Sequence, residues 1–308
     1  MTDRTETPLV AGVELGGTKV VCLLASGPGD IREHVRIPTT TPEVTLAGIA
    51  AVLERWRSGP GFAALGVASF GPLELDDRSP RFGQIIATPK PGWTGCALTA
   101  LGEGLAVPLA IDTDVNGAAL AEGRWGAARG LRSYAYVTVG TGIGVGSIVD
   151  GRSVRGLGHS EAGHLRVGRL KGDDWPGVCP YHGDCVEGLA SGPAVAARAG
   201  RPGDALDPDD PAWTMVVHAL GGLLHNLVLT TAPERILIGG GVADGQGWLF
   251  PRLRAALVDS LAGYATADRI AADLEAFVQP PGLGALAGPL GAIALAHKAL
   301  SEGPLSRR

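Results

Sequence analysis

The chain has 308 residues, of which 45% are hydrophobic, and a formal net charge of −5. This is enough apolar material for a large buried core in one or two domains. Clustered Lys and Arg do not occur, which argues against a nucleic-acid partner. The N-terminus "MTDRTETP" lacks an apolar signal region, and no uninterrupted apolar run looks long enough to span a bilayer. We therefore expect a soluble cytoplasmic protein that has no membrane partner.

The first part of the chain alternates strand-like and helical segments. Residues 9–26 predict strand, glycine turn and strand, because β-branched apolar residues flank "GG". "REHVRIPT" alternates as a third strand would, and Pro42 follows Thr41 at the start of a predicted helix. "ALGVASFGP" and "VPLAIDTD" predict buried strands, the second running into a helix, "VNGAALAEGRWGAA". This alternation predicts an α/β protein with a mostly parallel, helix-covered sheet.

The opening pattern returns in the second part of the chain. Residues 134–151 again predict strand, glycine-rich turn and strand, which suggests a duplicated domain with a cleft between the copies. Further helices are expected in "EGLASGPAVAARAG", "PAWTMVVHALGGLLHNLVLTTA" and "WLFPRLRAALVDSLAG", and strands in "RILIGGGV" and "LEAFVQP". We expect residues 1–112, joined by a closing helix at about 288–308, to form a small domain. Residues 113–287 would form a larger one.

Glycine turns follow three of the predicted strands. They are "LGGTK" at 15–19, "GTGIGVG" at 140–146 and "GGGV" at 239–242. Glycine lets backbone N–H groups approach an anion closely, although any one such turn is more often a simple tight turn. The first lacks the upstream glycine of a P-loop, and the second lacks the third glycine of the dinucleotide motif. Their combination favours the binding of a polyphosphate.

Two carboxylates, Asp112 and Asp114, lie between a predicted strand and a predicted helix. A carboxylate at this junction can be a helix N-cap. It can also be a general base, because open α/β sheets bind ligands at the carboxyl ends of their strands. Phosphoryl transfer to an alcohol needs an acceptor for the hydroxyl proton, and a carboxylate serves that purpose.

The stretch "CPYHGDC" contains Cys179, His182 and Cys185 at intervals of three. The two remaining cysteines, Cys22 and Cys96, lie elsewhere, so a disulfide framework is not expected. The nearby "HSEAGH" offers His164 as a fourth ligand, and a Cys2His2 set is typical of a closed, structural zinc site. The alternative is a pair of free cysteines beside surface histidines. A zinc ion here would fasten the two loops together and, with them, the neighbouring Glu187.

These motifs together resemble the ROK family of sugar kinases, and most closely its bacterial, zinc-containing fructokinase branch. The resemblance runs nearly end to end. The segments that carry it are "VELGGTK", "SFGP" (69–72), "ATPKPGW" (87–93), "DTDVNGAALAE" (112–122), "GTGIG" (140–144), "HSEAGH", "CPYHGDC" and "EGLASGP" (187–193).

The resemblance implies an actin-like (ribonuclease H-like) ATPase fold of two duplicated domains, and a homodimer. It implies ATP and Mg²⁺ as co-substrates, a structural Zn²⁺, and phosphorylation of the 6-hydroxyl of fructose. Asp114 matches the catalytic base of the family. The positions implied for the sugar are Gly71, Pro72, Thr113, His159, Glu161, His164 and Glu187. Those implied for the nucleotide are Thr18, Lys19, Thr141, Gly142, Pro193, Gly240 and Gly241. The implied zinc ligands are His164, Cys179, His182 and Cys185.

The chain departs from the family pattern at a few positions. Glu14 stands where many relatives have Asp, although the fructokinase branch often has Glu. Thr113 replaces the Asn of glucose-specific relatives, and a hydroxyl cannot offer the paired donor and acceptor of an amide. Ser160 stands where fructokinases commonly have Pro. The expected substrate is fructose, and the alternative is mannose, glucose or an N-acetylated hexose.

Two other classes of function are open to such a chain. Some members of the family are sugar-responsive repressors, but these need a DNA-binding helix pair ahead of the first core strand, which here begins by about residue 9. A zinc-stabilised sugar-binding scaffold without turnover is the other alternative. Asp114 in its full motif argues against it.

Overall fold

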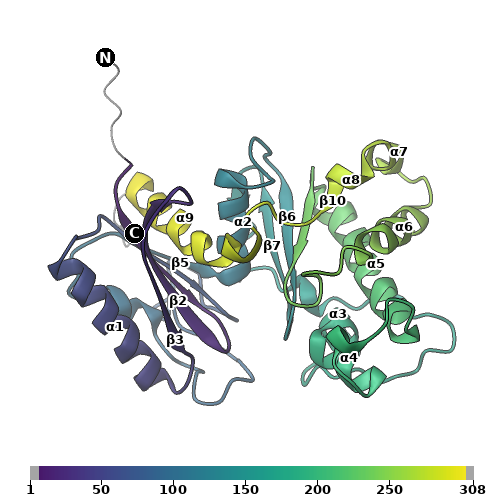
Figure 1. The fold of residues 1–308 in the computed structure, drawn as a ribbon, viewed down its shortest axis with the longest axis horizontal. Coiled ribbons are helices and arrows are strands. Elements are labelled where there is room, and N and C mark those ends of the chain that lie inside the picture. Colours follow the sequence, from purple (N-terminus) through teal and green to yellow (C-terminus); the bar gives the residue numbers. More distant parts are fainter. Residues whose placement is uncertain (1–6, 303–308) are drawn as a thin grey trace. The chain divides into compact units, whose positions relative to one another are not determined.

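The computed structural model describes residues 7–302, which form two compact units. The first unit comprises the described residues up to Arg129, together with Arg155–His159 and the chain from Ala285 onward. The second comprises Gly130–Val154 and Ser160–Gly284. Each unit is built around its own five-stranded sheet (Figure 1).

The sheet of the first unit has the order β3-β2-β1-β4-β5. Its strands are β1 (Val10–Leu15), β2 (Lys19–Gly27), β3 (Asp30–Pro38), β4 (Leu65–Ser69) and β5 (Leu109–Thr113). β1, β2 and β3 pair antiparallel, whereas β4 pairs parallel with both β1 and β5. The sheet is therefore mixed, with the predicted hairpin at residues 9–26 on one side and the two buried parallel strands on the other.

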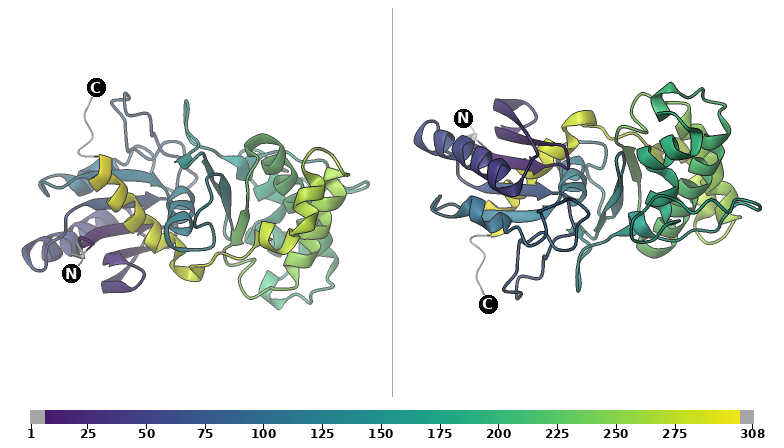
Figure 2. Two further views of the ribbon diagram at one scale, coloured as in Figure 1. Left: turned by 90° about the horizontal axis from the view of Figure 1, so that it is seen from above. Right: turned by 90° about the horizontal axis from the view of Figure 1, so that it is seen from below.

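The two faces of this sheet differ because alternate residues of β4 and β5 differ in size. Large side chains such as Val13 and Leu65 pack toward α1 (Pro42–Ser58), where Trp56 is completely buried. The opposite face is covered by α9 (Ala287–Glu302), drawn in yellow, and by α2 (Asp114–Trp125) (Figures 1 and 2). On that face a Cβ at Gly66 would lie 2.0 Å from the carbonyl oxygen of Ala292. Glycine thus lets the backbone of α9 rest directly on the sheet.

The sheet of the second unit has the order β10-β9-β6-β7-β8. Its strands are β6 (Tyr134–Val139), β7 (Ile143–Val149), β8 (Arg152–Ser153), β9 (Ile236–Gly239) and β10 (Val278–Gln279). β6 and β7 form an antiparallel hairpin, and β9 pairs parallel with β6 on its other side. A hairpin flanked by a parallel strand also occurs at β1, β2 and β4, as expected for a duplicated domain.

Helices cover one face of the second sheet. They are α3 (Val186–Ala190), α4 (Gly192–Ala199), α5 (Pro211–Thr231), α6 (Leu249–Leu261), α7 (Ala267–Ala272) and α8 (Leu274–Phe277). Short 3₁₀ turns occur at η1 (Leu98–Gly102), η2 (Ala162–His164), η3 (Gly203–Ala205) and η4 (Gly284–Leu286). α5 begins where the side chain of Asp210 accepts a hydrogen bond from the N–H of Ala212 at 3.0 Å. Its apolar residues, among them Trp213 and Leu224, join strand residues such as Val137 in one buried core.

One expectation about apolar segments needs correction. By length and composition alone, α5 is long and apolar enough to cross a membrane. However, 56% of the apolar stretch is buried inside the protein, where it packs against α6 and α3. α5 is therefore buried as a core helix of the second unit is.

The division into units also differs from the boundary expected at residues 112 and 113. α2 lies with the first unit because it packs along α9, where glycines oppose each other: a Cβ at Gly117 would lie 3.4 Å from the Cα of Gly291. The short segment Arg155–His159 belongs to the first unit as well, although residues of the second unit flank it in the chain.

Candidate active site and metal centre

The four predicted metal ligands come together in the second unit. One ligand atom from each of His164, Cys179, His182 and Cys185 lies within 4.8 Å of all the others. The Nδ1 atom of His164 lies 3.6 Å from the sulfur of Cys179 and 3.5 Å from that of Cys185. The Nδ1 atom of His182 lies 3.7 Å from the sulfur of Cys179.

These spacings suit tetrahedral zinc. Zn–S bonds of ~2.3 Å and Zn–N bonds of ~2.0–2.1 Å at a tetrahedral angle place sulfur and nitrogen about 3.6 Å apart. The observed separations between sulfur and Nδ1, from 3.5 to 3.7 Å, agree with that value. The residues therefore fit a closed Cys2His2 zinc site with no position left for a reacting group.

The local backbone explains why these ligands converge. A tight turn pairs Cys179 with Gly183, whose φ of +63° is one that glycine adopts readily. Cys185 then caps α3, its sulfur accepting a hydrogen bond from the N–H of Gly188 at 3.5 Å. Outside the cluster, Asp184 accepts hydrogen bonds from Arg166 and Arg169, both at 3.1 Å.

Glu187 connects the metal cluster to the glycine turn between β6 and β7. Its Oε1 lies 4.0 Å from Nδ1 of His164, and its Oε2 accepts a hydrogen bond from the N–H of Ile143 at 3.0 Å. A Cβ at Gly142 would lie 2.7 Å from that same Oε2, so glycine leaves room for the carboxylate. Glu161 directly precedes the 3₁₀ turn η2, which ends at His164. The sugar-binding positions predicted in this unit therefore adjoin the metal cluster.

In the first unit, Asp114 is the first residue of α2 and follows the carboxyl end of β5. Its Oδ1 accepts a hydrogen bond from the N–H of Val115 at 2.8 Å, which leaves Oδ2 for other partners. Burial raises the pKa of Asp114 to about 6. A carboxylate with this pKa is mostly ionised at neutral pH and is more basic than an ordinary aspartate.

Glu14 of β1 is a second carboxyl group in the first unit, and its pKa depends on Asp114. Burial, followed by repulsion from Asp114, raises the pKa of Glu14 to about 7, and Lys19 opposes the shift. A Cβ at Gly288 would lie 1.9 Å from Oε1 of Glu14, so the start of α9 leaves space for this carboxyl group.

The carboxylate of Asp112 is completely buried and holds the start of α2. Its Oδ1 accepts hydrogen bonds from the N–H of Thr113 and from Nδ2 of Asn116, both at 2.8 Å. The hydroxyl of Thr113 accepts a hydrogen bond from the N–H of Asn116 at 3.2 Å and so caps the helix. Arg155 donates to Oδ2 of Asp112 at 2.5 Å.

Gly71 and Pro72 lie beside His159 in the first unit. The peptide bond between Gly71 and Pro72 is cis. The Nε2 atom of His159 accepts a hydrogen bond from the N–H of Leu73 at 3.0 Å, and a Cβ at Gly71 would lie 3.4 Å from Cε1 of the same ring. His159 therefore supports this turn through one of its ring nitrogens.

In the second unit, the glycine turns at 140–142 and 240–241 lie close to the start of α4 at Gly192. The N–H of Gly192, at the start of α4, donates to the carbonyl of Gly140 at 2.7 Å. A Cβ at Gly140 would lie 3.9 Å from the backbone nitrogen of Gly241, and Gly240 has a φ of +94°. Thr141, Pro193 and the two glycines at 240 and 241 thus belong to one region. Thr18 and Lys19 lie in the first unit, at the exposed turn between β1 and β2.

The sequence motifs did not indicate the roles of Arg155, Asp112 and Gly288. Arg155 lies outside every recognised motif and is 43 residues from its partner. The sequence offered Asp112, with Asp114, as a helix cap or a general base, but not as the buried partner of Arg155. The glycine at 288 could have been noticed only as a small residue inside a closing helix.

The comparisons with known proteins agree on one family. The model of one protein family, described as "ROK family", matches residues 10–299 of this chain. The chain is 41% identical over 299 residues to a protein named "Fructokinase" from Zymomonas mobilis, with 95% of this chain and 98% of that protein covered. It is 39% identical over 295 residues to a "Fructokinase" from Pediococcus pentosaceus, covering 96% and 99%.

A solved structure extends the comparison to the fold. The ROK family glucokinase from Streptomyces griseus, in complex with glucose and AMPPNP, matches with a TM-score of 0.74 and 25% identity. The match covers 94% of this chain and 99% of that one. The two mixed α/β units are those of the actin-like ATPase fold, as the resemblance implied. On this evidence, the chain belongs to the ROK family.

Proposed function

We propose that this protein is an ATP-dependent fructokinase, which transfers the γ-phosphoryl group of ATP to the 6-hydroxyl of fructose. The observation that carries the kinase chemistry is the carboxylate of Asp114, which follows a sheet strand and has a pKa of about 6. The choice of fructose is supported by the two relatives named fructokinase, at 39% and 41% identity over nearly the whole chain.

In this proposal Asp114 is the general base. Its Oδ1 is engaged by the N–H of Val115, so Oδ2 accepts the proton as the sugar oxygen attacks the γ-phosphorus. General-base assistance of this kind contributes roughly 10²–10⁴ in rate. The N-terminus of α2 favours the ionised carboxylate, which keeps the base available at neutral pH.

We assign the sugar hydroxyls to Gly71, Pro72, Thr113, His159, Glu161, His164 and Glu187. The Nδ1 atom of His164 faces the cysteine sulfurs, which leaves Nε2 of this ring to bind a hydroxyl. The Oε2 atom of Glu187 accepts from Ile143, and the remaining lone pairs of the carboxylate suit a polyol. In this proposal zinc fixes these two side chains and takes no part in the chemistry.

The nucleotide phosphates are assigned to the glycine turns, through Thr18, Lys19, Thr141, Gly142, Pro193, Gly240 and Gly241. Backbone N–H groups at such turns suit phosphate oxygens. Mg²⁺ bound with ATP would neutralise phosphate charge, and it commonly keeps several waters in place of a protein cage. We also propose that the protein is cytoplasmic and forms a homodimer. Light scattering of the purified protein measures its mass in solution and so distinguishes a dimer from a monomer.

A hexokinase that prefers glucose, mannose or an N-acetylated hexose is the second candidate. The likeness to the Streptomyces griseus glucokinase favours it. Against it, the Thr113 hydroxyl already accepts a hydrogen bond from the N–H of Asn116, so it cannot offer the paired donor and acceptor of an asparagine amide.

A coupled ADP-release assay on fructose, mannose, glucose and N-acetylglucosamine tests the proposal. We expect the highest kcat/KM on fructose. A higher value on glucose or mannose would assign the chain to the second candidate. The absence of hexose-dependent ADP release would rule out both.

A further inference from the structure

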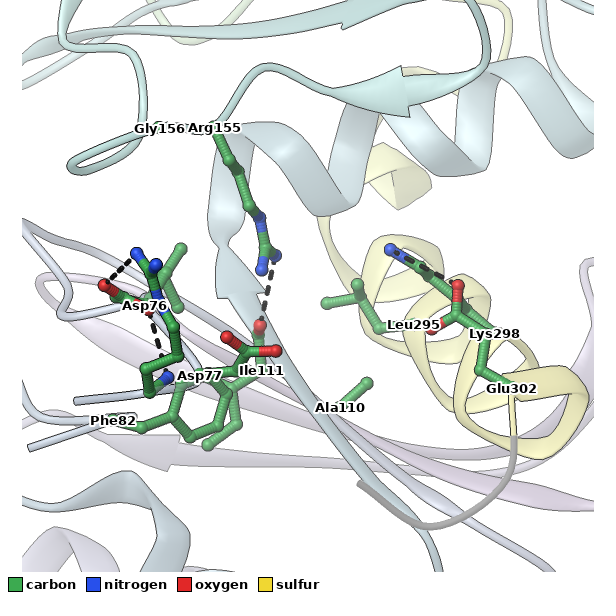
Figure 3. A pocket seen from close by; sticks show the side chains of 12 residues that line it. Asp76, Asp77, Phe82, Ala110, Ile111, Arg155, Gly156, Leu295, Lys298 and Glu302 are labelled. Atoms are coloured by element: carbon green, nitrogen blue, oxygen red, sulfur yellow. Dashed lines mark hydrogen bonds and ion pairs between the residues drawn. The ribbon is translucent and has the colours of Figure 1, made fainter. Parts of the chain in front are cut away.

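Arg155 reaches from its own short segment to the end of β5. Its guanidinium donates to Oδ2 of Asp112 at 2.5 Å and to the carbonyl oxygen of Ile111 at 3.5 Å. Figure 3 shows the side chain extending to Ile111 along one side of a pocket of ≈390 Å³. Residues of β5, α9 and the loop at 75–82 also line this pocket.

The partner of Arg155 is an anion removed from solvent. The side chain of Asp112 is 0% exposed, whereas that of Arg155 is 33% exposed. A buried carboxylate needs a counter-charge as well as hydrogen bonds, and loss of one member of such a pair leaves an uncompensated charge. Without Arg155, Oδ2 of this buried carboxylate would lose a charge-assisted hydrogen bond, and the carboxylate would move from its present position.

A movement of the Asp112 carboxylate would displace Asp114, the proposed catalytic base. The Oδ1 atom of Asp112 holds the N–H of Thr113 and the amide of Asn116. Thr113 precedes Asp114 in the chain, and its hydroxyl caps the first turn of α2. The position of Asp114 therefore depends on where the carboxylate of Asp112 is held.

We propose that Arg155 is a positioning residue for phosphoryl transfer, which acts through Asp112 to hold Asp114 in place. This inference rests on the proposed function, because it assigns Arg155 to the reaction in which Asp114 is the base. Displacement of a reacting group by about 1 Å costs up to roughly 10²-fold in rate. The loss should therefore appear in kcat, while the KM for ATP stays unchanged.

The pocket permits a test by chemical rescue. Arg155→Ala would leave a cavity continuous with the pocket, into which a small alkylguanidinium could diffuse and pair with Asp112. We expect Arg155→Ala to lower kcat by about 10–100-fold. Millimolar ethylguanidinium should restore part of this loss, and it should leave the wild-type rate unchanged. Arg155→Lys should keep more activity than Arg155→Ala because it retains the charge.

Arg78 provides the matched control. It lines the same pocket and pairs with Asp76, and its side chain is 79% exposed. Arg78→Ala should keep the wild-type kcat and should show no response to ethylguanidinium. Melting curves of every variant establish that the measured rates belong to folded protein.

The outcomes separate the two proposals. A wild-type protein without hexose-dependent ADP release overturns the proposed function and this inference with it. An active wild type with full kcat in folded Arg155→Ala overturns the positioning role alone. The positioning role is also overturned if Arg155→Ala has a lower kcat that ethylguanidinium does not restore and Arg155→Lys is equally slow. If Arg155→Ala does not fold, a folded Arg155→Lys with a lower kcat and an unchanged KM for ATP supports the proposal. A folded Arg155→Lys with the wild-type kcat contradicts it.

Discussion

At the residue scale, two opposing influences act on the carboxylate of Asp114. The N-terminus of α2 stabilises the ionised form, whereas removal from water disfavours it. The pKa of Asp114 is raised to about 6, so burial is the stronger of the two. The result is a base that is ionised at neutral pH and still basic enough to accept a hydroxyl proton.

We expect Asp114→Asn to lower kcat by about 10²–10⁴-fold, because the amide cannot accept the proton. The variant should fold and keep its zinc. In the wild type, kcat should fall as pH drops through about 6, where the carboxylate takes up a proton. Steady-state rates between about pH 5 and 8 measure both effects.

A surface variant serves as the control for this experiment. Asp268 is exposed in the first turn of α7, and Asp268→Asn should keep both the rate and its pH dependence. A near-normal rate in Asp114→Asn, or an unchanged acid limb in that variant, would remove Asp114 from the role of base.

Glu14 gives rise to a prediction about stability. The pKa of its carboxyl group is about 7 in the folded protein and about 4.5 as an ordinary glutamate, so between these values the folded state holds a proton that the unfolded state releases. The unfolding free energy therefore decreases as pH rises from about 4.5 to about 7. Glu14→Gln should remove this cost. Its gain in unfolding free energy over the wild type should be on the order of 1–2 kcal/mol larger at pH 8 than at pH 5.

Denaturant unfolding of Glu14→Gln and the wild type at the two pH values measures this difference. The same difference in stability at both would show that the carboxyl group of Glu14 titrates normally in the folded protein.

At the scale of elements, the contact between α9 and the first sheet depends on the absence of side chains. A Cβ at Gly66 would lie 2.0 Å from the oxygen of Ala292 and 2.6 Å from the nitrogen of Ala296. Both atoms belong to the helix backbone, so the helix itself would have to move. Gly12 is similar, since a Cβ there would lie 3.0 Å from the nitrogen of Ile293.

We therefore expect Gly66→Ala to lower the free energy of unfolding by about 3 kcal/mol, at the upper end of what overpacking usually costs. Gly29→Ala is the matched control, because a Cβ at Gly29 meets nothing within 4 Å. Urea unfolding of both variants measures the difference. Equal stability of Gly66→Ala and Gly29→Ala would mean that α9 does not pack directly on the sheet.

At the scale of the whole molecule, a zinc ion held by the four Cys and His ligands would fasten loops that contain few apolar side chains. It would join the turn at His164 to the loop from Cys179 to Cys185, and charged pairs such as Arg169 with Asp184 surround the ligands. Structural zinc contributes folding free energy in regions of this kind.

We expect Cys179→Ala to lose its zinc and to melt roughly 4–10 °C below the wild type. Its KM for the sugar should rise, because His164 and Glu187 lose their support. Cys96→Ala is the control, since Cys96 lies outside the cluster. Elemental analysis and thermal melts measure the effect, and a zinc-free variant with wild-type melting and kinetics would exclude the stabilising role.

The sequence predicted those features whose signal is local. Both hairpins were visible as apolar strands around glycine turns, and the spacing of Cys179, His182 and Cys185 indicated one metal site within a single short loop. Features that join distant residues were not visible. The pairing of Arg155 with Asp112 spans 43 residues, and the pKa of Glu14 depends on burial and on Asp114. The assignment of α2 to the first unit also depends on a helix near the other end of the chain. The roles of the site residues remain predictions.

The position of α9 bears on how the protein is made. The ribosome synthesises this helix after both sheets, yet it packs against β1, β2, β4 and β5 of the first one. During translation, the strands that lead to Asp114 therefore lack this part of their cover until α9 is made, whereas α3–α8 of the second unit precede α9 in the chain. We infer that the first sheet, and Asp114 with it, takes its final position only after α9 has been synthesised.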